Sequence, residues 1–257
     1  MKMVEGPTAR IIAERLDRSL KGKVIKQAFS RSRKVDAGLL AGERVERVYA
    51  VGKNILIETK TYLLRIHLMM WGSVGIYAKE EQLHKPERQI RLFLELDDLK
   101  VAVYNAPVIE LDEKRKLKKR IEENYGFDPL DPAWNRSAVL KAMKDNAELT
   151  VSQFLLSQKF IAGVGNIIRN EVLFRCRIHP ETRLKDLSPP ERENLIGEVV
   201  NFTRATYLLK KQKKRWGETM MVYRRKICPR CGEKIKRYKP DDTKRLTFYC
   251  PKCQTKK

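Results

Sequence analysis

The chain has 257 residues, of which 42% are hydrophobic and 34% are charged, and its 55 Lys and Arg against 32 Asp and Glu give a net charge of +23. A chain of this length buries roughly 70% of its unfolded surface, which excludes a tiny stapled fold and wholesale disorder. The positive charge indicates a polyanionic partner, with nucleic acid first, because Lys and Arg displace counterions from phosphates.

An anionic membrane is the competing polyanion, but the sequence does not support it. No apolar run reaches the length of about 18 residues that a membrane helix needs. Glu5, Arg10 and Glu14 interrupt any signal-peptide core. We therefore expect no membrane association and a cytoplasmic protein, nucleoid-associated if the source is prokaryotic, that acts as a monomer.

The first half of the chain predicts one helix and then short strands. Apolar residues at spacings of three and four, just after Pro7, predict a helix over Thr8–Leu20. Short β-branched and aromatic runs then predict strands at Val24–Phe29, Val45–Val51, Ile55–Thr59, Tyr62–Leu68, Val74–Tyr77, Ile90–Leu96 and Val101–Tyr104. Short strands with tight links indicate a β-sandwich or barrel and not a βαβ sheet.

The second half of the chain is predicted to be helical, and a domain boundary is predicted just before it. The charged stretch Asp112–Asn124 is most simply a solvated helix or a linker, and Phe127–Pro132 punctuates it. Helical patterns then cover Ser137–Asp145, Thr150–Gln158, Asn166–Arg175 and Pro189–Lys211, the last after a capping signal at Ser188. We expect three parts, with boundaries at residues 1–125, 126–222 and 223–257.

Four of the five cysteines stand in two CxxC pairs near the end of the chain. Cys228 and Cys231 are separated from Cys250 and Cys253 by eighteen residues, which is typical of a structural zinc site with four thiolate ligands. A redox pair or scattered buried cysteines are the weaker alternatives. The pattern predicts one structural zinc ion in a hairpin whose segment Lys244–Tyr249 alternates as a strand does.

The charge is concentrated in this same region. Residues 207–257 contain 18 Lys and Arg against 4 Asp and Glu, so +14 of the +23 lies in the last fifth of the chain. Upstream, Gly163-Val164-Gly165-Asn166 lies between two predicted helices, where glycines allow close backbone approach and a helix start favours an anion. A plain interhelical turn explains this motif equally well by itself.

Several blocks, weak alone, become specific in combination. They are MVEGP at the start, VGKN at 51–54, RIHLMMWG at 65–72, QKFIAGVGNIIRNEVLF at 158–174, and CPRC with KRLTFYCPKC at the end. In order and spacing the chain resembles the formamidopyrimidine-DNA glycosylase and endonuclease VIII family over nearly its whole length, with its closest likeness to the endonuclease VIII branch.

The resemblance implies an α+β fold and a repair enzyme. The expected architecture is an N-terminal β-sandwich with flanking helices, followed by a helix-two-turns-helix domain with a four-cysteine zinc finger. The implied activity is a base-excision DNA glycosylase with abasic-site lyase activity on damaged DNA. An N-terminal amine attacks C1′ of the nucleotide, and a terminal amine suits this role because its ordinary pKa of about 7.7 to 8.0 lies well below that of lysine.

The resemblance also implies roles for individual residues. Val4 takes the nucleophile's position and Glu5 that of the proton-transferring carboxylate. The residues implied to contact phosphate are Lys53, which is also counted among the catalytic residues, His67, Lys159, Asn166 and Arg245. Met70, between Met69 and Trp71, falls where the family fills the gap left by the flipped nucleotide; core packing at a strand end is the alternative reading.

Three departures from the family pattern refine the expected substrate. Val4 replaces the usual proline, as in a vertebrate-type minority of the family. The stretch at 101–111 resembles the endonuclease VIII branch, and the segment Leu208–Val222 is too short for the long loop associated with 8-oxoguanine. We therefore expect oxidised pyrimidines as substrates.

Two other functions fit part of the sequence. A non-catalytic zinc-finger protein that binds or senses damaged DNA would keep the DNA contacts without a terminal amine. An RNA-binding zinc-ribbon protein would explain the charge but not the MVEGP, VGKN or GVGN blocks.

The MVEGP block stands two residues late relative to the family. Met before Lys2 is expected to be retained, whereas Met before Val4 can be removed. We therefore expect that translation functionally starts at Met3, or that the first residues are otherwise lost, so that the mature enzyme begins with the free amine of Val4.

Overall fold

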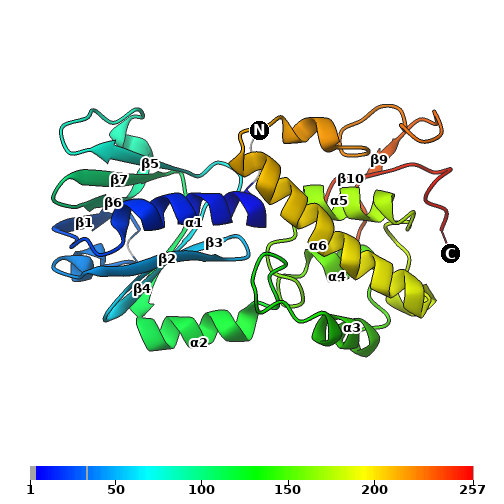
Figure 1. Ribbon diagram of the computed structural model, residues 1–257, viewed down its shortest axis with the longest axis horizontal. Helices are drawn as coiled ribbons and strands as arrows, with labels where there is room; N and C mark the ends of the chain where they lie inside the picture. Colours follow the sequence, from blue (N-terminus) through cyan, green and yellow to red (C-terminus); the bar gives the residue numbers. More distant parts are fainter. Residues whose placement is uncertain (1–3, 33, 257) are drawn as a thin grey trace. The chain divides into compact units, whose positions relative to one another are not determined.

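The structure, a computed structural model, describes residues 4–32 and 34–256 (Figure 1). The chain divides into two compact units, residues 1–124 and 125–257. Among the described residues, no helix is both long and apolar enough to cross a membrane. The Met1 to Met3 segment, on which the expected start of the mature chain depends, lies outside the described residues.

The first unit begins with helix α1, Gly6–Leu20, and then forms two antiparallel four-stranded sheets. The first sheet has the order β1-β6-β7-β5 and is built from β1 (Gln27–Ser30), β6 (Ile90–Glu95), β7 (Leu99–Tyr104) and β5 (Ser73–Ala78). The second has the order β2-β3-β4-β8 and is built from β2 (Val45–Val51), β3 (Asn54–Thr59), β4 (Tyr62–His67) and β8 (Val108–Glu113). Two short 3-10 helices, η1 (Ala37–Leu40) and η2 (Glu87–Gln89), lie in its loops.

One apolar core joins the two sheets and α1. It includes Leu16 and Leu20 of α1, Ile57 and Leu64 of the second sheet, and Leu94 of the first, all fully buried. Helix α1 packs against β2 and β3 (Figure 1). The alternating burial of β6 shows that this strand gives one face to the core, whereas β3 is buried at all of its positions. The predicted β-sandwich with a flanking helix is therefore confirmed.

The sequence reading of the segment after Tyr104 was incomplete, and that of the first strand was misplaced. Val108–Glu113 forms β8, an eighth strand of the described unit, and helix α2 begins only at Lys114 and ends at Asn124. The acidic residues of β8 concealed the strand, because they face Arg65 and Arg120 rather than solvent alone. The first strand covers Gln27–Ser30 and not Val24–Phe29, since Val24 forms only an isolated bridge.

The second unit contains four helices among its described residues, followed by the cysteine-rich hairpin. They are α3 (Arg136–Asp145), α4 (Val151–Leu156), α5 (Asn166–Arg175) and α6 (Pro189–Lys211), with 3-10 turns η3 (Leu184–Asp186) and η4 (Trp216–Thr219). The capping box at the start of α6 forms as predicted, because Ser188 and Glu191 bond each other's backbone amides. Helix α4 ends earlier than predicted, at Leu156.

The hairpin is shorter than the sequence pattern indicated. Strands β9, Lys236–Tyr238, and β10, Thr247–Tyr249, pair antiparallel, and the residues from Lys244 to Leu246 lie outside the ladder. Lys244 adopts a left-handed conformation with φ +50°, which is incompatible with a strand. Helix α5 packs against β10, so the hairpin is attached to the helical part of the unit.

Candidate active site and metal centre

Val4 and Glu5 lie immediately before α1, and both are buried, with 8% and 5% of their surfaces exposed. The carbonyl oxygen of Glu5 accepts hydrogen bonds from the amides of Thr8 and Ala9 at 2.9 and 3.1 Å. Glu5 is thus the residue that opens the helix, and Pro7 follows within its first turn. The partial positive charge of a helix N-terminus favours a carboxylate at this place. Two buried residues, one of them a carboxylic acid, therefore stand next to each other at the start of the helix.

Lys53 stands at the tip of the hairpin between β2 and β3. Val51 and Asn54 pair across the hairpin, so Gly52 and Lys53 form its two-residue turn. Gly52 has φ +57°, a conformation that glycine adopts without steric cost. The turn fixes the direction in which the half-buried Lys53 leaves the sheet.

His67, the last residue of β4, lies near Lys53 and is neutral at physiological pH. Burial, then the positive charges of Lys53 and Arg65, lower the pKa of His67 to about 4. The Nδ1 atom of His67 accepts a hydrogen bond from the amide of Met69 at 3.1 Å. The proton therefore resides on Nε2, and this N–H can donate a hydrogen bond to a phosphate oxygen.

A polar network supports the hairpin that carries Lys53. The fully buried Asn54 donates to the carbonyl of Val51 at 3.1 Å and accepts from Arg65 Nε at 2.9 Å. Arg65 also bonds Glu110 at 2.8 Å, and Glu110 bonds Arg120 at 2.8 Å. Sequence reasoning missed this network, although an arginine in the apolar strand β4 was a visible signal.

The turn after β4 presents apolar side chains to solvent. Met69 is 45% exposed and Trp71 is 69% exposed, whereas Met70 is half-buried. Met69 has φ +51°, and Gly72 leaves no room for a side chain because its Cβ would lie 2.5 Å from the carbonyl oxygen of Leu68. A tightly constrained turn thus holds two large apolar side chains in water, which is costly unless they contact a partner.

In the second unit, the loop between α4 and α5 carries Lys159 and the glycine motif. Gln158 organises this loop: its Oε1 accepts from the amide of Gly163 at 2.9 Å and its Nε2 donates to the carbonyl of Val164 at 3.0 Å. Gly163 requires its glycine, since φ is +93°. Lys159 is exposed, and no described interaction brings it to the other candidate residues of this unit.

Asn166 and Arg245 are brought close together. Asn166 is the first residue of α5, and its Nδ2 donates to the carbonyl of Leu246, the neighbour of Arg245, at 2.8 Å. Arg245 itself is exposed, and its carbonyl accepts from Thr247 Oγ1 at 2.9 Å. The start of α5 and the backbone that carries Arg245 are therefore held together, an arrangement that suits a phosphate.

Three further residues of α5 attach it to the hairpin and to the segment before it. Arg169 is fully buried and donates to Thr247 Oγ1 at 2.8 Å and to Asn166 Oδ1 at 2.6 Å. Asn170 accepts from the amide of Phe248 at 2.8 Å. Glu171 accepts from the amides of Met221, Val222 and Tyr223 at 2.8 to 3.0 Å. Sequence reasoning did not assign these residues, although three consecutive polar residues in the middle of a helix between apolar runs indicated a buried polar contact.

The four predicted metal ligands form one cluster. The sulfur atoms of Cys228, Cys231, Cys250 and Cys253 all lie within 4.8 Å of one another, and three of their separations are 3.5, 3.5 and 3.8 Å. A tetrahedral zinc ion with Zn–S bonds of about 2.3 Å requires S···S separations of about 3.8 Å. The cluster therefore fits a four-coordinate metal with no open position. Cys176 is separate, and burial raises its thiol pKa to about 12, which excludes a reactive thiolate.

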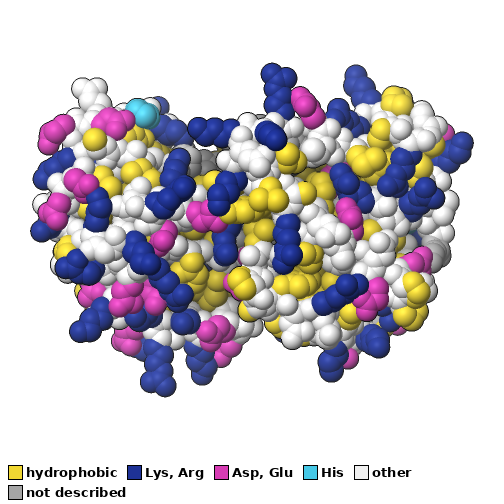
Figure 2. All heavy atoms as spheres, viewed as in Figure 1, with side chains coloured by type: hydrophobic (Ala, Val, Ile, Leu, Met, Phe, Trp, Pro, Cys, Tyr) yellow, Lys and Arg dark blue, Asp and Glu magenta, His cyan; other side chains and the backbone are white. Residues whose placement is uncertain are grey.

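Each unit thus assembles its own group of candidate residues. Val4, Glu5, Lys53, His67 and Met70 belong to the first unit, and Lys159, Asn166, Arg245 and the four cysteines belong to the second. Lys and Arg side chains are spread widely over the face of the molecule seen in Figure 2. Their side chains are of the types that can bind phosphate, transfer protons or hold a metal.

Comparison with known proteins gives a consistent result. Residues 3–108 match the formamidopyrimidine-DNA glycosylase N-terminal domain, and residues 125–214 match the formamidopyrimidine-DNA glycosylase H2TH domain. Endonuclease 8-like L720 of Acanthamoeba polyphaga mimivirus is 24% identical over 98% of this chain and 100% of its own. Endonuclease 8-like 3 of Mus musculus is 28% identical over 80% of this chain, which spans only 34% of that longer protein.

A solved structure shows the same fold. The Lactococcus lactis Fpg, in a crystal structure of its complex with DNA containing an abasic site, has a TM-score of 0.86 and 21% identity, covering 98% of this chain and 100% of that one. The two family domains occur in the expected order, and the fold and the cysteine cluster agree with them. The chain therefore belongs to the formamidopyrimidine-DNA glycosylase and endonuclease VIII family of DNA-repair enzymes.

Proposed function

We propose that this protein is a bifunctional DNA glycosylase and abasic-site lyase that removes oxidised pyrimidines through a Schiff base on the amine of Val4. The observation that carries the proposal is the pairing of Val4 and Glu5, buried side by side at the start of α1. A family whose members are base-excision glycosylases supplies the reaction class.

The proposed chemistry starts with the Val4 amine, which requires a mature chain that begins at Val4. The unprotonated nitrogen attacks C1′ of the damaged nucleotide, the glycosidic bond breaks, and the base leaves with a proton. Loss of the amine proton then gives an imine to C1′ after the sugar ring opens. Removal of a C2′ proton expels the 3′ phosphate by elimination, and water releases the amine from the product.

Glu5 is the proposed acid and base for these proton transfers. Its position next to Val4 in sequence places it within reach of the same sugar, and its burial excludes competing water. In the protonated state it donates to the ring oxygen when the ring opens. In the ionised state it accepts the proton that the elimination releases.

The phosphates flanking the lesion are the proposed ligands of Lys53, His67, Lys159, Asn166 and Arg245. His67 supports this role because its neutral ring keeps a proton on Nε2, so it can donate to a phosphate oxygen without adding a buried charge. Arg245 is exposed beside the start of α5, where both a cation and a helix N-terminus favour an anion.

Met70, flanked by Met69 and Trp71, is the proposed wedge for the space that a flipped nucleotide leaves. The exposed apolar surface of this turn would be covered by neighbouring bases, recovering part of the unstacking cost of a few kcal/mol. The segment Leu208–Val222, at and after the end of α6, supports a pyrimidine substrate, because it leaves few residues to cover a bulky purine lesion.

Zinc is the proposed metal of the four-cysteine cluster. Four thiolates at near-tetrahedral separations match its preferred coordination, and the closed ligand set leaves it a structural role only. The finger, residues 223–257, would then present Arg245 to DNA, while residues 126–222 form the helix-two-turns-helix part and residues 1–125 the catalytic part.

Borohydride trapping on DNA with an abasic site tests the function directly, because only a Schiff-base enzyme becomes covalently linked to its substrate. We expect a trapped complex, and excision from duplexes that carry an oxidised pyrimidine in preference to 8-oxoguanine. Tight binding to damaged DNA with neither trapping nor excision would instead identify a non-catalytic damage-binding protein.

A further inference from the structure

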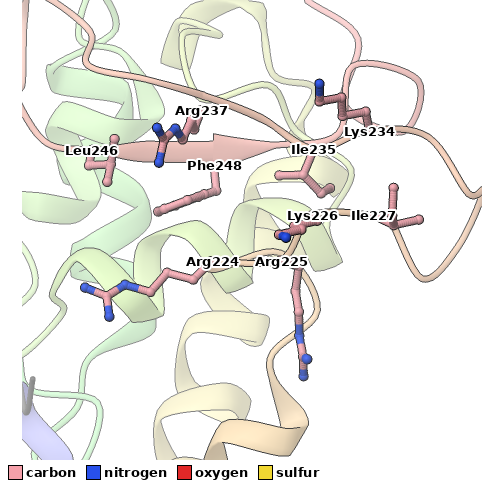
Figure 3. Close-up of a pocket in the computed structure, with 9 residues that line it drawn as sticks. All are labelled: Arg224, Arg225, Lys226, Ile227, Lys234, Ile235, Arg237, Leu246 and Phe248. Atoms are coloured by element: carbon pink, nitrogen blue, oxygen red, sulfur yellow. The ribbon is translucent and has the colours of Figure 1, made fainter.

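A groove on the zinc-finger hairpin is lined by cations and aliphatic side chains and by no acidic residue. It has a volume of about 730 Å³. Its nine lining residues are Arg224, Arg225, Lys226, Ile227, Lys234, Ile235, Arg237, Leu246 and Phe248. Figure 3 shows Arg237 and Arg224 on opposite sides of Leu246 and Phe248, with Lys226 to one side of them, next to Ile235. None of these residues has a role in the chemistry derived above.

The five cations of this groove lack the carboxylate partners that many cations elsewhere in the chain have, although Arg225 donates to the carbonyls of Met220 and Gly217. Lys141 pairs with Asp145 at the C-terminal end of α3, and Arg183 pairs with Glu148. Among the described residues, by contrast, no ion pair involves a cation of the groove, although all five side chains are exposed. Five like charges on one part of the hairpin repel one another, so a bound anion would relieve this repulsion.

The fold fixes the backbone that carries these cations. Ile227 and Lys234 form an isolated bridge, and the amide of Ile235 donates to the carbonyl of Lys226 at 2.9 Å, which fixes the two sides of the groove. Phe248 packs edge to face on Tyr223 at 5.1 Å and forms the buried floor. The backbone on both sides of the groove is therefore constrained, so the points from which the cationic side chains leave it are fixed.

The groove is also continuous with the proposed phosphate site. Leu246 lines it, and the carbonyl of Leu246 is the acceptor of the Asn166 amide. Arg245 is the preceding residue. If one phosphate of a DNA strand lies at Asn166 and Arg245, the adjoining part of that strand would lie over the groove.

We propose that this groove is a second binding surface for the phosphate backbone of DNA, taking phosphates farther from the lesion than those at Asn166 and Arg245. The inference rests on the proposed function, since it takes DNA as the partner, and extends it to a surface that no chemistry requires. The apolar floor carries no donor for a base edge, so binding here is independent of sequence and serves to hold the enzyme on undamaged DNA.

The test compares two double variants with equal loss of charge. Lys234→Gln with Arg237→Gln removes two cations of the groove that make no described side-chain bond, and Lys141→Gln with Lys144→Gln removes two exposed cations of α3. Affinity is measured on lesion-containing duplexes that are lengthened in steps on either side, over a range of salt concentrations. Zinc content and circular dichroism show whether each variant is folded.

We expect wild-type affinity to rise when the duplex is lengthened on one side and the groove variant to lose that gain. Its slope of log affinity against log salt should fall by about 1.8, and its affinity on long duplexes by up to about 60-fold at 0.1 M salt, because each phosphate contact contributes a slope of about 0.9. The α3 variant should keep both wild-type values. Excision from the shortest duplex should be unchanged in the groove variant.

Two results would overturn the inference. One is a groove variant with wild-type slope and length dependence on DNA. The other is a groove variant that keeps DNA binding and loses binding to poly-glutamate, which would assign the groove to an acidic protein. Failure of the wild-type protein to excise any lesion would refute the proposed function separately, because the length dependence of DNA affinity does not require catalysis.

Discussion

The side-chain amide of Asn166 donates a hydrogen bond to the carbonyl oxygen of Leu246 over 2.8 Å, across 80 residues of sequence. The same side chain accepts from Arg169, which is itself bonded to Thr247. The first turn of α5 and the segment that carries Arg245 are thereby held together. The position of one proposed phosphate ligand therefore depends on the side chain of the other.

Asn166→Ala should weaken binding to lesion-containing DNA about five- to tenfold without changing the salt slope, because it removes an uncharged side chain and loosens Arg245. Arg245→Gln should lower the slope by about 0.9, since one phosphate contact is lost. Zinc content should stay the same in both. Fluorescence anisotropy at several salt concentrations checks these values, and an unchanged affinity for Asn166→Ala would contradict the coupling.

Glu5→Gln should preserve DNA binding and reduce excision of an oxidised pyrimidine by about 100-fold or more, because it keeps the shape of the side chain and removes its proton-transfer capacity. Single-turnover kinetics on a lesion duplex provide the measurement. A preformed abasic site bypasses glycosidic cleavage, so partial lyase activity there is compatible with the assignment. Wild-type excision by the variant would exclude Glu5 as the acid.

A protein prepared to begin at Val4 should form the borohydride-trapped complex, and a protein that retains Met1 should not, because an amide nitrogen is no nucleophile. Intact-mass analysis identifies the N-terminus of each preparation, and binding to an uncleavable abasic analogue controls for folding. Full-rate trapping by the Met1 form would move the nucleophile to another amine, with Lys53 the first to substitute.

His67 should make the folded state less stable at acid pH. Its pKa is lowered by burial, then by Lys53 and Arg65, from 6.5 to about 4, so the unfolded chain takes up its proton first as pH falls. The stability from the neutral ring is complete above pH 6.5 and is lost between pH 6.5 and 4, by on the order of 1 to 3 kcal/mol. Urea unfolding across this range should show a shallower pH dependence for His67→Gln than for wild type, and equal slopes would refute it.

Cys250→Ser should release the metal and unfold the hairpin, because three thiolates bind zinc far more weakly than four and the finger has a small apolar core. Elemental analysis should fall from one zinc per chain towards zero, with loss of DNA affinity. The thiol of Cys176 lies outside the cluster, so Cys176→Ser is the matched control and should keep its zinc. A metal-free but fully folded hairpin would contradict the structural role.

The features that sequence reasoning recovered are those encoded by short-range pattern. The two CxxC pairs predicted the four clustered cysteines, because each pair is brought together by a local turn and only one long-range contact is needed to join the two pairs. Helix α5 began at Asn166 as predicted, and α6 spans the predicted Pro189–Lys211. The prediction failed where the spacing of residues was ambiguous. The acidic residues of β8 resemble those of a solvated segment, and only the fold shows that Glu110 pairs with Arg65.

The tertiary structure decided which side chains act together and in which protonation state. Arg65 and Glu110, and Arg169 and Thr247, meet through folding, and no periodicity reports contacts between residues so far apart in sequence. The neutral ring of His67 likewise follows from burial and from the charges that surround it in space. Sequence determines local conformation and the chemistry available, whereas distance and desolvation, which set electrostatic energies, exist only in the folded chain.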